Sequence, residues 1–328
     1  MKHQMAEPQM VGGALELLQP GRTRLGMGCG DLYGGARHSQ SARLVQAAFD
    51  AGIRYFDVAR LYGNGSAEGV LGNVLRPMRD RVIITTKVGI LPWSMQLGKR
   101  LARKAAIATR ALGPLARKLV PPPPPAAERY GAFDRRDMQR SIERSLKALQ
   151  TDYIDILLLH ECTPSDALAV ETRDLLEKFL CAGKIRAYGI ASRYDDTLRL
   201  LHDAPPALTQ VTQIPSDVFN RNVRHLPSGK RFVVTHSALK HALPRLREYL
   251  SARPDASARW QAALGTSSSD TSSLARILVG LALEDNPSGV VLFSTSHPER
   301  LTDMVAKPFS RDALVLAREE ITRMSLGT

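Results

Sequence analysis

The sequence has very little cysteine, and its 328 residues contain no clustered set of metal-ligating side chains. Cys29, Cys162 and Cys181 are too few and too irregularly spaced for a disulfide framework or a zinc site. The acidic residues are too scattered to predict a metal site. We therefore expect a reducing, cytoplasmic setting, in which each cysteine is a small buried apolar residue rather than a nucleophile.

Long uninterrupted apolar runs are also missing. The most apolar late stretch, residues 274–293, contains three charged residues and a proline, so we expect no transmembrane segment. The region after Met1 is broken up by charged residues and a proline, which argues against a signal peptide. A hydrophobic content of 44% in a chain of this length allows a sizeable core, in one large α/β barrel or in two domains.

Negative charge is absent from residue 81 to residue 127, although the whole chain has 32 acidic residues against 45 lysines and arginines. The formal net charge of +13 is concentrated in part in this stretch, which carries Lys99, Arg100, Arg103, Lys104, Arg110, Arg117 and Lys118. Residues 92–120 have helical composition, and the prolines at 121–125 indicate an extended polyproline spacer. We interpret residues 91–133 as a basic, proline-rich insertion or lid within a single domain of residues 1–328.

Three roles remain open for this insertion. It could be a solvated amphipathic cap over the barrel mouth, or a lid that contributes Trp93, Met95 or Leu97 to a substrate pocket. Residues 94–118 could also contact an acidic protein or an anionic membrane surface. We expect no nucleic-acid partner, because no recognition motif accompanies the charge.

The rest of the chain alternates short apolar segments with amphipathic ones. Strands are predicted at residues 24–30, 55–59, 82–87, 153–160, 185–192, 208–214, 231–237 and 289–295. Helices are predicted at 41–51, 66–75, 134–149, 165–182, 195–202, 274–283, 297–306 and 311–324, with Ser39 and Ser66 as N-caps, while 241–269 is expected to be an irregular polar loop. Eight alternating strands predict an α/β fold of the (β/α)8 TIM barrel type, with the insertion after strand 3.

Four polar side chains lie at or just after predicted strand ends: Asp57, Tyr62, Lys87 and His160. In a (β/α)8 barrel such positions meet on one rim. A buried Asp57 needs a cationic partner, and Lys87 would supply it. Because an unperturbed phenol with a pKa of about 10 is a poor acid, we expect the Lys87 ammonium to lower the pKa of Tyr62. The set predicts carbonyl reduction, in which Tyr62 donates a proton, hydride reaches the carbon and His160 polarises the carbonyl.

Each of these residues has a plainer explanation when it is taken singly. His160 could be structural, Lys87 solvated, Tyr62 a packed loop aromatic and Asp57 a turn or cap former. Their joint placement at neighbouring strand ends favours catalysis.

The setting of these residues resembles the aldo-keto reductase family over roughly residues 22–308. The matching segments are FDVARLYGNGSAEGVLG at 56–72, TTKVG at 85–89, SLKALQTDYIDILLLH at 145–160, YGIAS at 188–192, Gln213, HSAL at 236–239 and STSHPERL at 294–301. The resemblance implies a catalytic tetrad of Asp57, Tyr62, Lys87 and His160. It also implies an NAD(P)H cofactor that lies across the barrel mouth without a Rossmann fold.

The same resemblance implies cofactor contacts at Ser192, Gln213, His236, Ser237, Leu239, Ser294, Thr295 and Arg300. Arg300 could bind a 2′-phosphate, which favours NADPH (NADP) over NADH, or it could simply be exposed. The chain departs from the family pattern at Ala191, His236, Ala238, Lys240 and Met304. His236 replaces a tyrosine that stacks on the nicotinamide, so it could stack there or only pack in the loop.

We therefore predict an NADPH-dependent oxidoreductase that converts an aldehyde or ketone to an alcohol, or the reverse. The small-molecule substrate itself is not predicted. The alternative is a cofactor-binding regulatory or interaction protein that has a reductase-like barrel and little turnover, and that docks a partner through its basic insertion.

Overall fold

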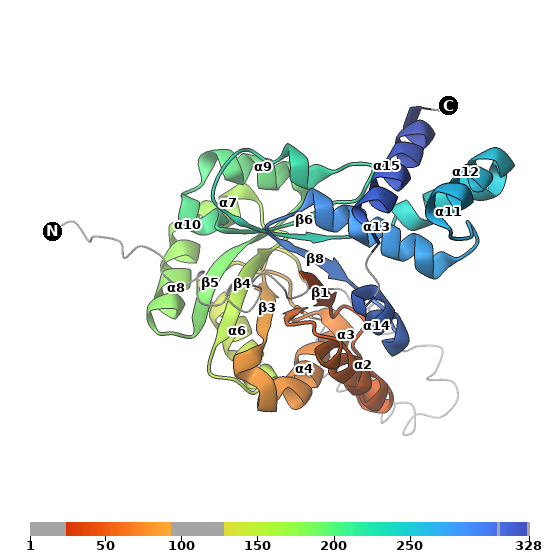
Figure 1. The fold of residues 1–328 in the computed structure, drawn as a ribbon. Helices are drawn as coiled ribbons and strands as arrows, with labels where there is room; N and C mark the ends of the chain where they lie inside the picture. The colour runs from red at the N-terminus through yellow and green to blue at the C-terminus, as the bar shows by residue number, and fades with distance from the viewer. Residues whose placement is uncertain (1–23, 93–127, 307–308, 327–328) are drawn as a thin grey trace, which may run out of the picture.

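The computed structural model describes residues 24–92, 128–306 and 309–326 (Figure 1). Eight parallel strands close into a barrel in which each strand pairs with the next and β8 pairs with β1. The predicted (β/α)8 barrel is confirmed, whereas most of the predicted insertion, 93–127, lies outside the described residues. The strands are β1 (Leu25–Gly28), β2 (Tyr55–Asp57), β3 (Ile83–Val88), β4 (Ile154–His160), β5 (Ile185–Ala191), β6 (Val211–Pro215), β7 (Phe232–His236) and β8 (Val290–Phe293).

Helices surround the barrel, and within the described ranges none is both long and apolar enough to cross a bilayer. Those on the first half are η2 (Gly35–Arg37), α2 (His38–Asp50), α3 (Tyr62–Gly65), α4 (Ala67–Leu75), η3 (Arg76–Arg81), α6 (Arg135–Leu149), α7 (Pro164–Leu168) and α8 (Val170–Cys181). Those on the second half are α9 (Tyr194–Asp203), α10 (Pro206–Thr209), η5 (Asn222–His225), α11 (Ala242–Ala252), α12 (Pro254–Leu264), α13 (Thr271–Asp285), α14 (Pro298–Ala306) and α15 (Arg311–Leu326).

Two apolar layers follow from the alternation of side chains along the strands. One face of each strand fills the barrel interior, where Tyr55, Ile83, Ile156 and Val234 belong to one buried cluster. The opposite face packs against the apolar stripes of the helices in a second, larger cluster. Every strand is therefore buried on both faces, which is why the strand sequences are almost continuously apolar.

The polar segment predicted as a loop at 241–269 is largely helical, so that prediction is wrong. It contains α11 and α12, which Figure 1 places beside α13 and α15. Leu246, Leu250 and Trp260 are buried against those two helices. The many arginines and serines on the outer faces hid this apolar stripe in the sequence.

Several predicted helix starts also differ from the structure. Helix α2 begins at His38, so Ser39 lies inside it and caps nothing. Ser66 precedes α4 but makes no capping bond; its hydroxyl donates to the Gly63 carbonyl and accepts from the Gly34 amide. The helix predicted at 165–182 is interrupted at Ala169, whose ψ of 133° is not helical.

The early part of the strand predicted at 208–214 is likewise helical, because residues 206–209 form α10.

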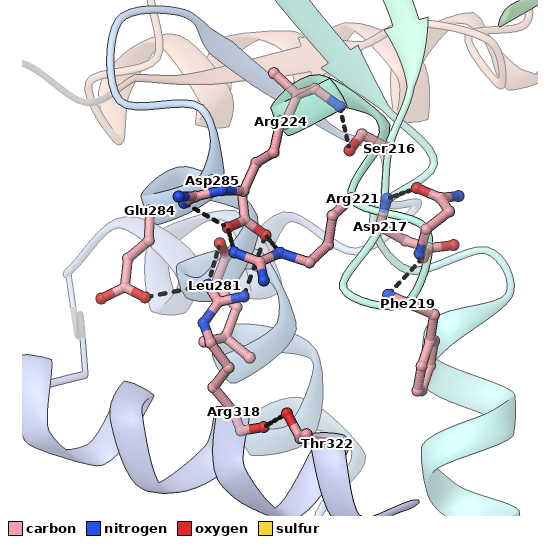
Figure 2. A network of polar contacts seen from close by, with 12 residues as sticks. Ser216, Asp217, Phe219, Arg221, Arg224, Leu281, Glu284, Asp285, Arg318 and Thr322 are labelled. Carbon is pink, nitrogen blue, oxygen red and sulfur yellow. Dashed lines mark hydrogen bonds and ion pairs between the residues drawn. The ribbon is translucent and has the colours of Figure 1, made fainter. Parts of the chain in front are cut away.

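A buried carboxylate ties the loop after β6 to α13 and α15 (Figure 2). Asp285, at the end of α13, accepts two hydrogen bonds from Arg221, at 2.7 and 3.1 Å, which makes this pair bidentate. Arg224 and Arg318 approach the same carboxylate to 3.4 and 3.2 Å, and Arg318 also reaches Glu284 at 3.3 Å. The Asp285 side chain is only 3% exposed, so these contacts replace the water that it has lost.

We expect Asp285→Asn to lower the free energy of unfolding by about 2–3 kcal/mol, because the guanidinium groups gathered there lose their counter-charge. Asp255→Asn is the matched control: its carboxylate pairs with Arg259 at 2.8 Å on the surface, and its loss should hardly change stability. Urea unfolding of both variants measures the difference. Equal midpoints for the two variants would contradict a stabilising role for Asp285.

Candidate active site

Three polar side chains lie at the carboxyl ends of neighbouring strands and face the interior of the barrel. Asp57 ends β2, Lys87 is the last inward residue of β3, and His160 ends β4. Each is an even number of residues from an apolar side chain of the barrel interior, so all face the barrel axis. The closed parallel sheet therefore brings them together at its carboxyl end.

Asp57 and Lys87 form a buried ion pair, as predicted. Lys87 Nζ lies 2.5 Å from Asp57 Oδ1, and the two side chains are 1% and 4% exposed. Lys87 also donates to the Val58 carbonyl at 3.1 Å and to the Tyr62 hydroxyl at 3.4 Å, while Gln213 Nε2 donates to Asp57 Oδ2 at 2.8 Å. Burial acts to lower the pKa of Lys87, but Asp57 and Tyr62 outweigh it and raise that pKa. Lys87 is thus held as an ammonium.

A sharp turn directly follows Tyr62. Gly63 has a φ of +57°, and a Cβ there would lie 1.8 Å from the Leu32 carbonyl oxygen, so only glycine fits. Asn64 continues the left-handed turn with a φ of 56°. The Tyr62 ring then meets His160 edge to face, with the ring centres 6.2 Å apart and the planes at 86°.

The electrostatic effect on Tyr62 is opposite to the one predicted from the sequence. Lys87 acts to lower the pKa of Tyr62, but burial and the negative charge of Asp57 together outweigh it. The pKa of Tyr62 is therefore raised above its ordinary value of 10. Because Asp57 largely cancels the charge of Lys87, the phenol is a protonated hydrogen-bond donor at neutral pH.

Two imidazoles beside the phenol are neutral. Burial, with help from Lys87 and His236, lowers the pKa of His160 to about 3. Burial lowers the pKa of His236 to about 4; Asp57 opposes this shift, and Lys87 and Lys240 add to it. Neither ring brings a positive charge to the site at neutral pH.

A cavity of about 620 Å³ opens over Tyr62 and His160. Six of the predicted cofactor contacts line it: Ser192, Gln213, His236, Ser237, Leu239 and Ser294. A second cavity of about 360 Å³ is lined by the other two, Thr295 and Arg300, and also by Met304. The two cavities share Asp31, Leu239, Phe293 and Ser294, so they are adjacent. The structure thus brings every predicted site residue except the deeply buried Lys87 to the wall of one or the other of these two adjacent cavities.

Some of these side chains already have partners. The Ser192 hydroxyl donates to the Cys162 carbonyl and lies 2.9 Å from the Cys162 thiol. Ser237 has a φ of 66°, and its hydroxyl lies 2.8 Å from His236 Nδ1, which orients the imidazole. The described residues bring together no group of three metal-ligating side chains.

Sequence reasoning missed four charged residues of these cavities: Asp31, Glu161, Arg276 and Asp303. Asp31 follows β1 and Glu161 follows β4, so their place next to a strand end was the available signal. Arg276 lines the second cavity from α13 and stacks on Phe309 at 4.6 Å. Nothing in the spacing of α13 predicted that Arg276 faces this cavity.

The fold and site together define a (β/α)8 barrel protein with a cluster of buried titratable side chains at its strand ends. A model of the aldo/keto reductase family matches residues 24–309, and the chain belongs to this family. The chain is 28% identical over 221 residues to the aldo-keto reductase YhdN of Bacillus subtilis, covering 65% of this chain and 56% of that protein. It is 30% identical over 179 residues to a 6-dehydroglucose reductase of Novosphingobium aromaticivorans, covering 51% and 46%. The matched segments thus span about half the length of these curated relatives.

Solved structures share the fold. A glycerol dehydrogenase of Gluconobacter oxydans superimposes with a TM-score of 0.67 at 19% identity, covering 94% of this chain and 93% of the other. An aldo-keto reductase of Klebsiella pneumoniae in complex with NADPH gives 0.62 at 21% identity, covering 93% and 90%. At these identities the likeness supports the barrel architecture.

We expect the NMR signals of His160 and His236 to stay at their neutral positions between pH 8 and pH 5, because both pKa values lie well below that range. An unfolded imidazole titrates near its ordinary value of about 6.5, so this pair favours the folded state above that pH. Their contribution should be lost as the pH falls from about 6.5 toward 4 and 3.

Signals would be assigned with His160→Gln and His236→Gln. A full titration of either assigned signal between pH 5 and 8 would show that the rings are better hydrated than the structure indicates.

Proposed function

We propose that this protein is an NADPH-dependent oxidoreductase that interconverts a small aldehyde or ketone and its alcohol, with Tyr62 as the general acid and base. The observation that carries the proposal is the Tyr62 hydroxyl, 3.4 Å from Nζ of the buried Lys87, on the wall of a cavity. Membership of a family of reductases supports the same chemistry.

The cavities suit a long cofactor that is aromatic at one end and anionic at the other. The neutral His236 imidazole lines the cavity next to Tyr62 and offers a flat face for a ring. At the other end, Arg300 and Arg276 line the second cavity and could hold phosphate oxygens, although Asp31 and Asp303 lie in the same wall. When bound, the nicotinamide cofactor would supply or accept the hydride.

The chain's own residues would handle the proton. Tyr62 would donate its phenolic proton to the carbonyl oxygen while the carbon is reduced, and Lys87 would stabilise the phenolate that this leaves. Asp57 keeps Lys87 charged and in place. The neutral imidazole of His160 could donate a hydrogen bond to the same oxygen without adding charge. In the reverse direction the phenolate would accept the alcohol proton.

The preference for NADPH over NADH rests on the second cavity. Arg300 and Arg276 reach it from α14 and α13, two helices that are separate in sequence. A 2′-phosphate would find paired positive charge there, which NADH could not exploit. The Klebsiella pneumoniae structure in complex with NADPH supports this preference.

We expect Tyr62→Phe to lower kcat for aldehyde reduction by about 10²–10⁴-fold, because the ring remains but the proton is lost. Binding of NADPH should stay nearly unchanged, as measured by fluorescence titration. Tyr249→Phe is the control, since it removes a phenol of α11 that lies outside the lining of both cavities. Unchanged turnover in the Tyr62 variant would reject the proposed mechanism.

We expect Arg300→Ala to weaken NADPH binding by about tenfold and to leave NADH binding almost as it was, because only NADPH presents the 2′-phosphate. The NADPH affinity of the wild-type protein should also fall as salt rises. Parallel titrations with both cofactors measure this, with Arg140→Ala on the exposed face of α6 as the control. An equal loss of affinity for both cofactors would show that Arg300 does not bind the 2′-phosphate.

A further inference from the structure

One charged side chain of the catalytic cavity has no role in the proton transfer. Glu161 directly follows His160 and lines the cavity together with Tyr62 and His160. Its φ of 52° takes it out of the alternation of β4, and its amide donates to the Ala191 carbonyl at 2.8 Å. A non-glycine residue rarely adopts this conformation, so the backbone holds the carboxylate on the cavity wall rather than on the outer face of the strand.

The Glu161 carboxylate has no hydrogen bond or ion pair with any residue in the described ranges 24–92, 128–306 and 309–326. Burial raises the pKa of Glu161, Arg193 acts against that shift, and Asp196 adds to it. Glu161 is exposed and is influenced by Arg193 without forming an ion pair with it, so its carboxylate is available to a ligand that brings a cation.

The other charged side chains of this cavity also bear on the choice of ligand. Asp57 is neutralised by Lys87, and the two imidazoles are neutral. Among the described residues, the other charged side chains that line the cavity over Tyr62 are Asp31, Glu161 and Lys240, which are two carboxylates and one ammonium.

Acidic side chains also lie near Tyr130, outside the cavity wall. Tyr130, whose ring is exposed, has its pKa raised by its hydrogen bond to Glu128, by the charge of Glu128, by burial and by the charge of Glu161. Glu161 is therefore close enough to Tyr130 for their charges to interact. A carboxylate near an exposed aromatic ring is a favourable setting for an ammonium group.

We propose that Glu161 is a specificity-determining residue that selects carbonyl substrates carrying a protonated amine, with the carboxylate pairing the ammonium while the carbonyl faces Tyr62 and His160. This inference rests on the proposed function for its second half, the orientation of the carbonyl. The preference for a cation over a neutral or anionic ligand does not require turnover. A carboxylate-bearing carbonyl compound would be repelled from the same position.

The test compares three alcohols that differ only at the para position: 4-(aminomethyl)benzyl alcohol, 4-methylbenzyl alcohol and 4-carboxybenzyl alcohol. Their binding to the full chain is measured by calorimetry at pH 7, with and without NADP⁺. We expect the cationic alcohol to bind about tenfold tighter than the neutral one, and the anionic alcohol to bind most weakly. Glu161→Gln should abolish most of this preference and leave the neutral alcohol unaffected.

Glu171→Gln, which removes an exposed carboxylate in the first turn of α8, should leave the preference as in the wild type. A preference that survives in Glu161→Gln, or a variant that loses affinity equally for all three alcohols, overturns the inference. Reduction of 4-methylbenzaldehyde with NADPH tests the proposed function separately, because that substrate carries no charge. If this reduction fails while the Glu161-dependent preference for the cationic alcohol is intact, the proposed function is rejected and the specificity site is kept.

Discussion

The buried ion pair between Asp57 and Lys87 is the constraint on which the site depends. Two charges removed from water are stable only when both are fully paired, and here Gln213, Val58 and Tyr62 complete the set of partners. Such a pair adds little net stability compared with apolar side chains of similar size. The ion pair acts locally. Lys87 holds a positive charge beside the Tyr62 hydroxyl, while the Asp57 carboxylate keeps that phenol protonated.

Much of the site could be predicted because a parallel barrel converts position along each strand into position in space. Asp57, Lys87 and His160 are far apart in sequence but end inward rows on three adjacent strands. The two-residue period fixes which face each side chain takes, and closure of the sheet fixes the shared rim. Apolar strand segments that end at a polar or charged residue were therefore enough to place these three side chains, without knowledge of any contact.

The features that could not be predicted depend on the relative sizes of opposing electrostatic effects and on backbone dihedral angles. Neither can be read from the periodicity of the sequence. The pKa of Tyr62 results from opposing effects of Lys87, Asp57 and burial, and their relative sizes require coordinates. Glu161 faces the cavity because its φ is positive, which its residue type does not indicate. Helices α11 and α12 were missed because their buried stripes are narrow and their exposed faces are rich in arginine and serine.

The strongly basic composition is a poor guide to the chemistry of the cavity, because many arginines are used inside the fold. Asp155 binds both Arg79 and Arg186, and Asp285 gathers guanidinium groups in the same way. Each of these carboxylates is nearly buried, so the surrounding arginines compensate it locally and contribute little field at the barrel mouth. Among the described residues, the cavity over Tyr62 is lined by Asp31, Glu161 and Lys240, so its local charge does not follow the charge of the whole chain. Net charge therefore constrains solubility and non-specific partners, whereas the proposed substrate selection depends on the charged side chains that line the cavity.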